Sequence, residues 1–319
     1  MNNSPLVSVI IPVYNAERFV ESAVRSIMNQ TYTNLEILVT DDCSTDGSFE
    51  ILQRLASEDS RITLYRNEAN LKIVGTLNSL VAAASGKYIA RMDADDISLP
   101  KRIEKQVAFL ESNPDYALCG TNAWHIDENG RRIGRSCLPE SFEENKFFLQ
   151  FYSTFYHPTV MLRSEIYKQN LYDEKFLYAE DYELWARLVF AENAKGANIK
   201  EKLLKYRIFK NQSSEEHRKE QNESSARIFD KYSIVLEAFV CFHKNCFFLH
   251  EGGKNAAELD YARNLFRKLS RAKTAYSFAA IQKLLLHIYR NYSKAAFASF
   301  AASPCGLYAC FRTVVGKVI

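Results

Sequence analysis

Apolar residues follow two alternating patterns along the first 92 residues of the chain. Residues 6–13 are apolar almost throughout and rich in β-branched residues, which predicts a strand buried on both faces. Residues 35–40, 61–66 and 87–92 predict three further strands. The stretches between them carry apolar residues every three or four positions, which predicts amphipathic helices.

The first helix is expected to be capped by Asn15 and to carry an apolar stripe from Phe19 to Met28, and the other two cover residues 48–58 and 74–85. Strands and helices that alternate at this spacing indicate right-handed βαβ units. The sequence therefore predicts an α/β fold with a mostly parallel central sheet flanked by helices.

The pattern changes after residue 113. Residues 116–134 predict two strands joined by a turn at Asn129-Gly130. Residues 153–167 predict another strand, with Pro158 near its start or on a sheet edge.

Residues 179–190 predict a helix with Leu184, Leu188 and Trp185 facing inward. Glu180 and Asp181 fall in its first turn, where the helix dipole favours acidic side chains. This pattern alone leaves open whether the two acids stabilise the helix or take part in catalysis.

Charge is distributed unevenly, although the net charge is only +3. Residues 1–200 carry 21 Lys and Arg against 28 Asp and Glu, a net −7, whereas residues 201–319 carry 20 against 10, a net +10. No acidic residue follows Asp260, but ten Lys or Arg do. Such a block is typical of a partner with phosphates, either nucleic acid or an anionic membrane. We divide the chain into an α/β domain, 1–213, and a basic, aromatic, helical region, 214–319.

Cysteine use and hydropathy favour a cytoplasmic protein. The seven cysteines form no CxxC pair, which indicates free thiols in a reducing compartment. The N-terminus lacks a basic segment before its apolar run, so we expect no signal peptide. The longest uncharged stretch, 295–311, is broken by Pro304 and Gly306 and predicts an interfacial rather than a spanning segment.

Three loops are expected at the carboxyl ends of the parallel strands, where ligands bind in such sheets. They are residues 12–17, 41–48 and 93–96, and the last two are strongly acidic. One acidic loop is explained as well by a solvated turn, because Asp favours turns. Two carboxylate clusters at one end of a sheet instead indicate a divalent cation beside a phosphate ligand.

Six motifs then occur in an order that resembles family 2 glycosyltransferases over about residues 6–213. They are "VSVIIPVYNAERFVESAVRSIMNQTY", "DDCSTDGS", "AASGKYIARMDADDISLPKRIEKQ", "HPTVMLRSEIY", "FLYAEDYELWARL" and "YRIFKNQSS". The resemblance implies a GT-A, Rossmann-like fold and an inverting, metal-dependent transfer from a nucleotide-diphospho-sugar.

The resemblance also implies roles for single residues. The residues that would frame the nucleotide are Pro12, Tyr14, Asn15 and Glu17. Asp41, with Asp42 as a second candidate, would accept a hydrogen bond from the uracil imide. Asp95 would ligate Mn²⁺ or Mg²⁺, both of which prefer oxygen ligands, and Asp93 would lie near the ribose and the metal. Asp181 would be the general base.

Three positions depart from the family pattern. Cys43 stands where Gly is more frequent, and Leu71 where a Gly often follows Asn. Phe209 replaces a His two residues after Arg207, so Arg207 would carry more of the binding of the diphosphate. The third side of the metal site is therefore left undetermined by the resemblance.

Four other residues have alternative explanations. His157 either lines the acceptor site or is structural, and Arg91 either approaches the diphosphate or pairs with a nearby acid. Trp124 and Trp185 are expected in the core, because they stand on apolar-patterned elements.

The function that the resemblance implies is transfer from a UDP-sugar (galactose, glucose or N-acetylglucosamine) to a hydroxyl of a lipid-linked, lipopolysaccharide, O-antigen or capsule glycan. The enzyme would be peripheral on the inner face of the plasma membrane, held through its basic C-terminal region. One alternative is an inactive nucleotide-sugar or membrane-binding module. Another is a sugar-phosphate nucleotidyltransferase, although the loop after the first strand lacks the glycines that such enzymes use. The aromatic residues of the basic region have near-helical spacing, which does not favour binding of nucleic acid by base stacking.

Overall fold

The structure is a computed structural model that describes residues 4–149, 152–209 and 217–232. Most of the predicted basic region, including residues 295–311, lies outside the described residues. Its predicted helices and membrane contact therefore stay predictions.

The first half of the chain forms a parallel sheet with the strand order β3-β2-β1-β4. The strands are β1 Val7–Val13, β2 Leu35–Asp41, β3 Ile62–Arg66 and β4 Tyr88–Arg91. The connecting helices are α1 Val20–Met28, α2 Ser48–Glu58 and α3 Lys72–Ala83. The predicted strand–helix alternation and the α/β fold class are confirmed.

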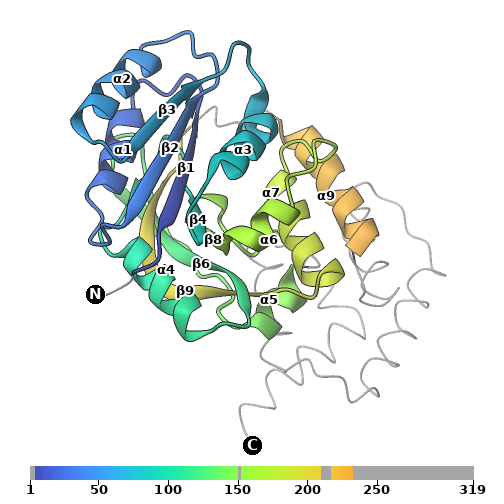
Figure 1. Cartoon of the computed structure of the whole chain (residues 1–319). Helices are drawn as coiled ribbons and strands as arrows, with labels where there is room; N and C mark the ends of the chain where they lie inside the picture. Colours follow the sequence, from blue (N-terminus) through green and yellow to red (C-terminus); the bar gives the residue numbers. More distant parts are fainter. Residues whose placement is uncertain (1–3, 150–151, 210–216, 233–319) are drawn as a thin grey trace, which may run out of the picture. The chain divides into compact units, whose positions relative to one another are not determined.

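Helices cover both faces of this sheet (Figure 1). Ile10 belongs to a core that contains residues of α3, whereas its neighbours Val9 and Ile11 belong to a second core that contains residues of α1 and α2. Because side chains alternate across a strand, burial on both faces favours apolar residues at nearly every position. This explains the apolar run of β1, in which Ser8 is the one polar residue and donates its hydroxyl to Glu36.

The second half extends the sheet with mixed pairing, in the order β4-β8-β6-β9-β5, and β7 pairs with β6. The strands are β5 Ile97–Ser98, β6 Tyr116–Ile126, β7 Arg132–Arg135, β8 Met161–Arg163 and β9 Lys195–Arg207. The helices are α4 Arg102–Ser112, α5 Phe142–Phe148, α6 Ser164–Gln169, α7 Glu180–Ala186 and α9 Arg218–Tyr232. The strand β8 is antiparallel to β4 and to β6, and β9 is parallel to β6.

Two local expectations are wrong. Asn15 does not cap α1, which begins at Val20; its φ of 48° is left-handed and its side chain braces a neighbouring loop instead. The segment 153–167 is not one strand, because Pro158 lies in a short 3₁₀ helix, His157–Thr159, before the three-residue β8. Proline lacks the N–H that a ladder needs, which accounts for this break.

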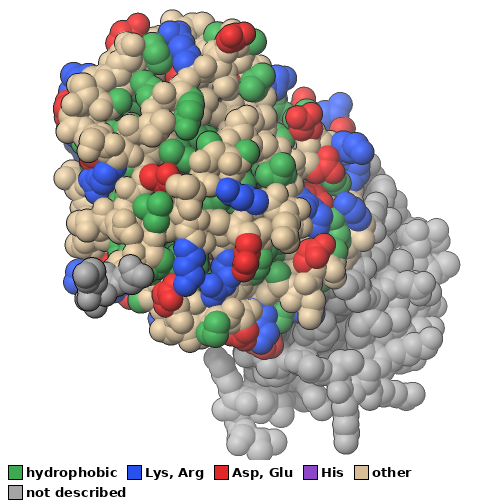
Figure 2. Space-filling model, viewed as in Figure 1, with side chains coloured by type: hydrophobic (Ala, Val, Ile, Leu, Met, Phe, Trp, Pro, Cys, Tyr) green, Lys and Arg blue, Asp and Glu red, His purple; other side chains and the backbone are tan. Residues whose placement is uncertain are grey.

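Helix α9 lies beyond the predicted domain boundary at residue 213 and packs against the α/β domain. Ile228 and Tyr232 are buried in the same core as Leu184 and Trp185 of α7. Charged side chains of both signs and single hydrophobic side chains are interspersed on the face shown in Figure 2. Within the described ranges, the structure contains no helix with the length and apolar character that a membrane span requires.

Candidate active site

The loop after β1 and the loop after β2 are joined by hydrogen bonds. The backbone N–H of Asn15 donates to Ser44 Oγ (3.0 Å), and Asn15 Oδ1 accepts from the N–H of Thr45 (2.8 Å). Glu17 Oε2 accepts from the N–H of Gly47 (2.9 Å). Two of the predicted nucleotide-framing residues therefore shape this rim.

The other two framing residues differ in exposure. Tyr14 is 51% exposed, so its ring is available to a ligand. Pro12 is buried in β1, where it pairs with Thr40.

Asp41 is a fully buried carboxylate with one oxygen left without a partner. Its Oδ2 accepts from the N–H of Ser44 (3.2 Å) and lies 3.3 Å from Nε of Arg66. Its Oδ1 is buried and has no hydrogen-bond partner. Because buried polar atoms are nearly always satisfied, this oxygen is a candidate acceptor for a ligand.

Asp42, by contrast, holds the loop before α3. Its Oδ1 accepts from Asn67 Nδ2 (2.7 Å) and from the N–H of Leu71 (2.8 Å). The backbone conformation can be compared at Cys43 and Leu71, two positions that depart from the family pattern. Cys43 has a φ of 61°, a left-handed conformation that glycine adopts most easily, whereas the left-handed residue of the second loop is Lys72 (φ 59°) rather than Leu71.

Asp93, Asp95 and Asp96 come together immediately after β4. One oxygen of each lies within 4.8 Å of the other two. Burial and the neighbouring Asp93 carboxylate raise the pKa of Asp95 to about 7. Burial, Asp95 and Asp93 raise the pKa of Asp96 well above its usual value, and its Oδ2 is buried without a partner. A divalent cation would relieve the repulsion among carboxylates that are crowded in this way.

Three arginines surround this acidic cluster. Arg91 is buried and forms an ion pair with Asp93. Arg102 is fully buried and donates to the backbone carbonyl of Arg91 (2.6 Å), which fixes the end of β4. Arg207 donates through Nε to the carbonyl of Asp95 (2.7 Å), while Asp96 Oδ1 accepts from its backbone N–H (2.7 Å).

Arg207 also reaches the turn that follows β6. Its Nη1 donates to the carbonyls of Asp127 (3.1 Å) and Glu128 (2.9 Å), and its guanidinium lies 4.4 Å from the Phe19 ring centroid. These contacts hold the acidic loop against the sheet. The predicted contact between Arg207 and the diphosphate stays a prediction.

Glu180 and Asp181 begin α7. Glu180 is buried, its Oε2 has no partner, and burial with the neighbouring Asp181 raises its pKa to about 7. Asp181 is half-buried, and burial raises its pKa to about 6, although the Tyr182 N–H and Arg91 partly offset the shift. Asp93 raises the pKa of both carboxyl groups and Arg91 lowers both, so the two acidic clusters lie close enough to interact.

His157 lies beside this pair. Its Nε2 is 2.6 Å from the hydroxyl of Tyr172, and its Nδ1 is 4.0 Å from Oε1 of Glu180. Burial and Arg91 lower the pKa of His157 well below its usual value, so the ring is neutral at pH 7. It therefore forms no ion pair with Glu180.

The tryptophans differ from each other. Trp185 is fully buried, which confirms its predicted core position. Trp124 is only half-buried, with the guanidinium of Arg132 3.1 Å from its ring centroid and the ammonium of Lys202 5.1 Å away. The expectation that Trp124 is a core residue is wrong, because its half-buried ring is covered by the cationic side chains of Arg132 and Lys202.

Residues 8–171 match the family described as Glycosyl transferase family 2. The chain belongs to glycosyl transferase family 2. The family resemblance of the motifs is thus confirmed, and the nucleotidyltransferase alternative is not supported.

Two relatives of this glycosyltransferase come from Escherichia coli. The "O-antigen biosynthesis glycosyltransferase WbnJ" is 34% identical over 240 residues, which are 74% of this chain and 89% of WbnJ. The "UDP-Glc:alpha-D-GlcNAc-diphosphoundecaprenol beta-1,3-glucosyltransferase WfgD" is 32% identical over 204 residues, 64% of this chain and 77% of WfgD.

A solved structure has the same fold. It is the mannosyltransferase PcManGT of Pyrobaculum calidifontis in complex with GDP-Man and Mn²⁺, with a TM-score of 0.57 and 17% identity over 99% of this chain and 89% of PcManGT. At this identity, the likeness shows the GT-A fold alone.

Proposed function

We propose that this glycosyltransferase moves a sugar from a UDP-sugar to a hydroxyl group with inversion at the anomeric carbon. The observation that carries the proposal is that two carboxylate clusters, Asp93–Asp96 and Glu180–Asp181, lie within electrostatic reach of each other around Arg91. One cluster suits a metal-bound diphosphate and the other suits an acid–base group.

The acidic cluster fits a divalent metal. Asp93, Asp95 and Asp96 offer only oxygen ligands, and a buried oxygen of Asp96 has no partner, which favours Mg²⁺ or Mn²⁺. Asp95 and Asp93 would hold the ion as predicted, with Asp96 as a further candidate. A bound ion would supply positive charge to the departing diphosphate.

Asp181 is the proposed general base. Its carboxylate would take the proton of the acceptor hydroxyl while that oxygen bonds to the anomeric carbon and the bond from this carbon to the diphosphate breaks on the opposite face. The raised pKa of about 6 supports this role, because a base with a pKa near the working pH accepts a proton more readily than an ordinary carboxylate.

The free oxygen of Asp41 supports recognition of uracil. Asp41 Oδ1 is buried without a partner at the rim formed by the β1 and β2 loops. It would accept from the imide N–H of uracil, whereas cytosine has no donor at that ring position. Asp42, whose Oδ1 binds Asn67 and Leu71, is then a support for this loop.

The acceptor that we propose is a lipid-linked or O-antigen-type glycan. The support is in the names of the relatives, since WfgD is named for a diphosphoundecaprenol acceptor and WbnJ for O-antigen biosynthesis.

The proposal is tested by measuring UDP release from a panel of UDP-glucose, UDP-galactose and UDP-N-acetylglucosamine with Mn²⁺. We expect slow hydrolysis of at least one of them and none of GDP-mannose or of a CDP-sugar. Absence of UDP release from every UDP-sugar would instead favour the alternative of an inactive binding module.

The pH dependence of this hydrolysis reports on the base. The pKa of Asp181 is raised to about 6, so the ionised form that accepts a proton is lost as the pH falls through that value. At saturating Mn²⁺ and donor, kcat should therefore fall by about tenfold for each pH unit below this pKa. A rate that stays constant from pH 7 to pH 5 would show that no group with this pKa is the base.

We further propose that the basic region places the enzyme on the inner membrane surface. The support is the ten Lys or Arg after Asp260 without an acidic residue among them, because each such residue near an anionic surface contributes about 1 kcal/mol. The protein should pellet with anionic but not neutral vesicles, and salt should release it. Equal recovery in the supernatant with both vesicle types would exclude this attachment.

A further inference from the structure

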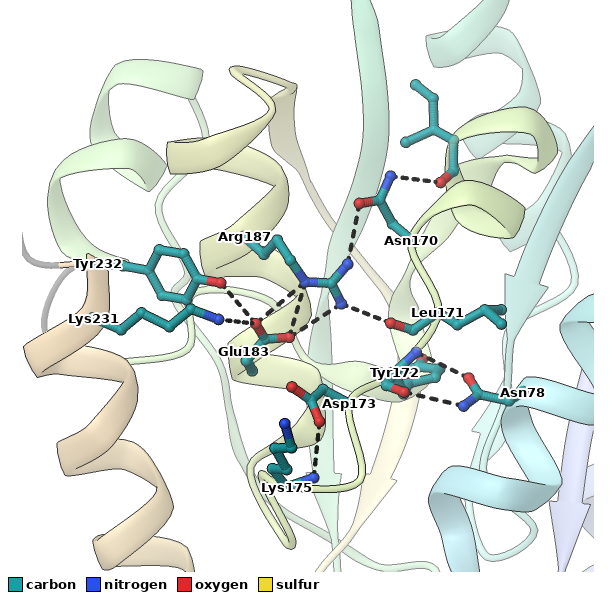
Figure 3. Close-up of polar contacts among 11 residues, drawn as sticks. Asn78, Asn170, Leu171, Tyr172, Asp173, Lys175, Glu183, Arg187, Lys231 and Tyr232 are labelled. Carbon is teal, nitrogen blue, oxygen red and sulfur yellow. Dashed lines mark hydrogen bonds and ion pairs between the residues drawn. The ribbon is translucent and has the colours of Figure 1, made fainter.

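Glu183 is a fully buried carboxylate on α7, two residues after the proposed base. Its Oε1 accepts from the hydroxyl of Tyr232 (2.8 Å) and lies 3.4 Å from the ammonium of Lys231. Its Oε2 accepts from Nη2 of Arg187 (3.1 Å), and both oxygens are 3.2 Å from Nε of Arg187 (Figure 3). The two residues Lys231 and Tyr232 end helix α9.

Arg187 extends this network to the segment that precedes α7. Its Nη1 donates to Asn170 Oδ1 (3.1 Å), and its Nη2 donates to the carbonyl of Leu171 (2.6 Å). The backbone of Tyr172, the next residue, exchanges two hydrogen bonds with the side chain of Asn78 on α3 (2.9 and 3.1 Å; Figure 3). Residues 170–172 are therefore held from two sides.

This segment leads back to the proposed catalytic carboxylates. The hydroxyl of Tyr172 binds His157 Nε2 (2.6 Å), and His157 Nδ1 is 4.0 Å from Glu180. The position of Tyr172 thus determines what lies beside Glu180, the immediate neighbour of Asp181.

Helix α9 contacts residues 175–178, which lie between residues 170–172 and the start of α7. Gln221 Nε2 donates to the carbonyl of Tyr178 (3.0 Å), and Arg227 Nη2 donates to the carbonyl of Lys175 (2.6 Å). The Phe176 ring is 5.2 Å from the guanidinium of Arg227 and 5.4 Å from the ammonium of Lys231. Helix α9 thus contacts the chain on both sides of Phe176, before α7, and also contacts Glu183 within α7.

We infer that Glu183 is a positioning residue that fixes Asp181 by joining α7, residues 170–172 and α9 at one buried point. Separating the partners of a buried ion pair leaves an uncompensated charge, which is strongly unfavourable. The ion pairs of Glu183 therefore hold the three segments in one arrangement. Glu183 itself touches no reacting group. The effect on catalysis rests on the proposed role of Asp181, whereas the effect on the segment does not.

The test compares Glu183→Gln, Tyr232→Phe and the control Glu174→Gln in the full chain. Glu183→Gln removes the charge and keeps the shape, and Tyr232→Phe removes only the hydroxyl that donates to Glu183 Oε1. Glu174 is exposed on the same segment, so its replacement removes the same charge without touching the network.

Hydrogen–deuterium exchange of residues 170–182 gives the first readout. We expect exchange to rise about tenfold in Glu183→Gln, as for the loss of a charge-assisted hydrogen bond, and less in Tyr232→Phe. Exchange in β1–β3 should not change. Unaltered exchange in 170–182, or an equal rise in β1–β3, would overturn the inference.

Steady-state UDP release with Mn²⁺ gives the second readout. Glu183→Gln should lower kcat about 10- to 100-fold with the KM for the donor unchanged, because a displacement of about 1 Å can cost roughly 100-fold in rate. A local rise in exchange with an unchanged kcat would overturn the link to catalysis. If Asp181→Asn keeps wild-type turnover, the proposed base is wrong, and exchange alone then decides whether Glu183 holds the segment.

Discussion

Replacing Asp181 with Asn should lower turnover by at least roughly 100-fold, the loss typical of a removed general base. Asn has the same shape and keeps the start of α7, but it cannot accept a proton. Affinity for UDP should not change, since Asp181 lies on α7 and not in the loops that we propose to hold the nucleotide. The measurement is kcat for UDP release, together with the UDP dissociation constant from calorimetry.

Asp173→Asn is a matched control for this change. Asp173 lies in the segment before α7, where its Oδ1 caps the N–H of Lys175 (3.0 Å), and it should keep nearly full activity. If Asp181→Asn turns over normally, Glu180→Gln is the next variant, because Glu180 has the neighbouring buried carboxyl with a raised pKa.

Replacing Asp95 with Asn should abolish the dependence of UDP binding on metal. In the wild-type protein, UDP should bind much more tightly with Mn²⁺ than with EDTA, because the ion would neutralise both the diphosphate and the crowded carboxylates. The Asn side chain keeps the volume at this half-buried position but removes the charge. Calorimetric titration of UDP into each protein, with Mn²⁺ and with EDTA, measures the difference.

Asp115→Asn controls for loss of an acidic residue in general. Asp115 is exposed and pairs with Lys195 (2.7 Å) away from the acidic cluster, so this variant should keep the wild-type response to Mn²⁺. UDP affinity that is equal with and without metal in the wild-type protein would contradict the metal assignment.

The strands and helices of the first half were predictable because their periods are strong. Helix α2 covers the predicted residues 48–58 without a shift, and β1 differs from its prediction by one residue. The apolar residues of these elements are buried in two cores, one that contains Ile10 and one that contains Val9. Local pattern and burial therefore point to the same structure.

The second half was less predictable because its structure depends on distant pairing. Strand β9 carries six charged or polar side chains between Lys195 and Lys205 and pairs with both β6 and β5. Its apolar alternation is interrupted, so no local signal marked it as a strand. The break at Pro158 is a case in which proline chemistry outweighed a β-branched run.

The residues of the candidate site also divide into those that the sequence could indicate and those that it could not. The motifs singled out Asp95 and Asp181 as candidates, and the roles proposed for them come from the family resemblance. They did not identify Arg102 or Glu183, which are both fully buried ions. Their importance comes from tertiary contacts with the end of β4 and with α9, and neither leaves a pattern in the local sequence.

The most direct test of the account is a crystal structure of the protein with UDP and Mn²⁺, with the ion located by anomalous scattering. We predict an anomalous peak between the diphosphate and the carboxylates of Asp93, Asp95 and Asp96, with the uracil imide donating to Asp41 and Asp181 free of metal. A peak at Glu180 and Asp181, or UDP bound away from the β1 and β2 loops, would contradict the account.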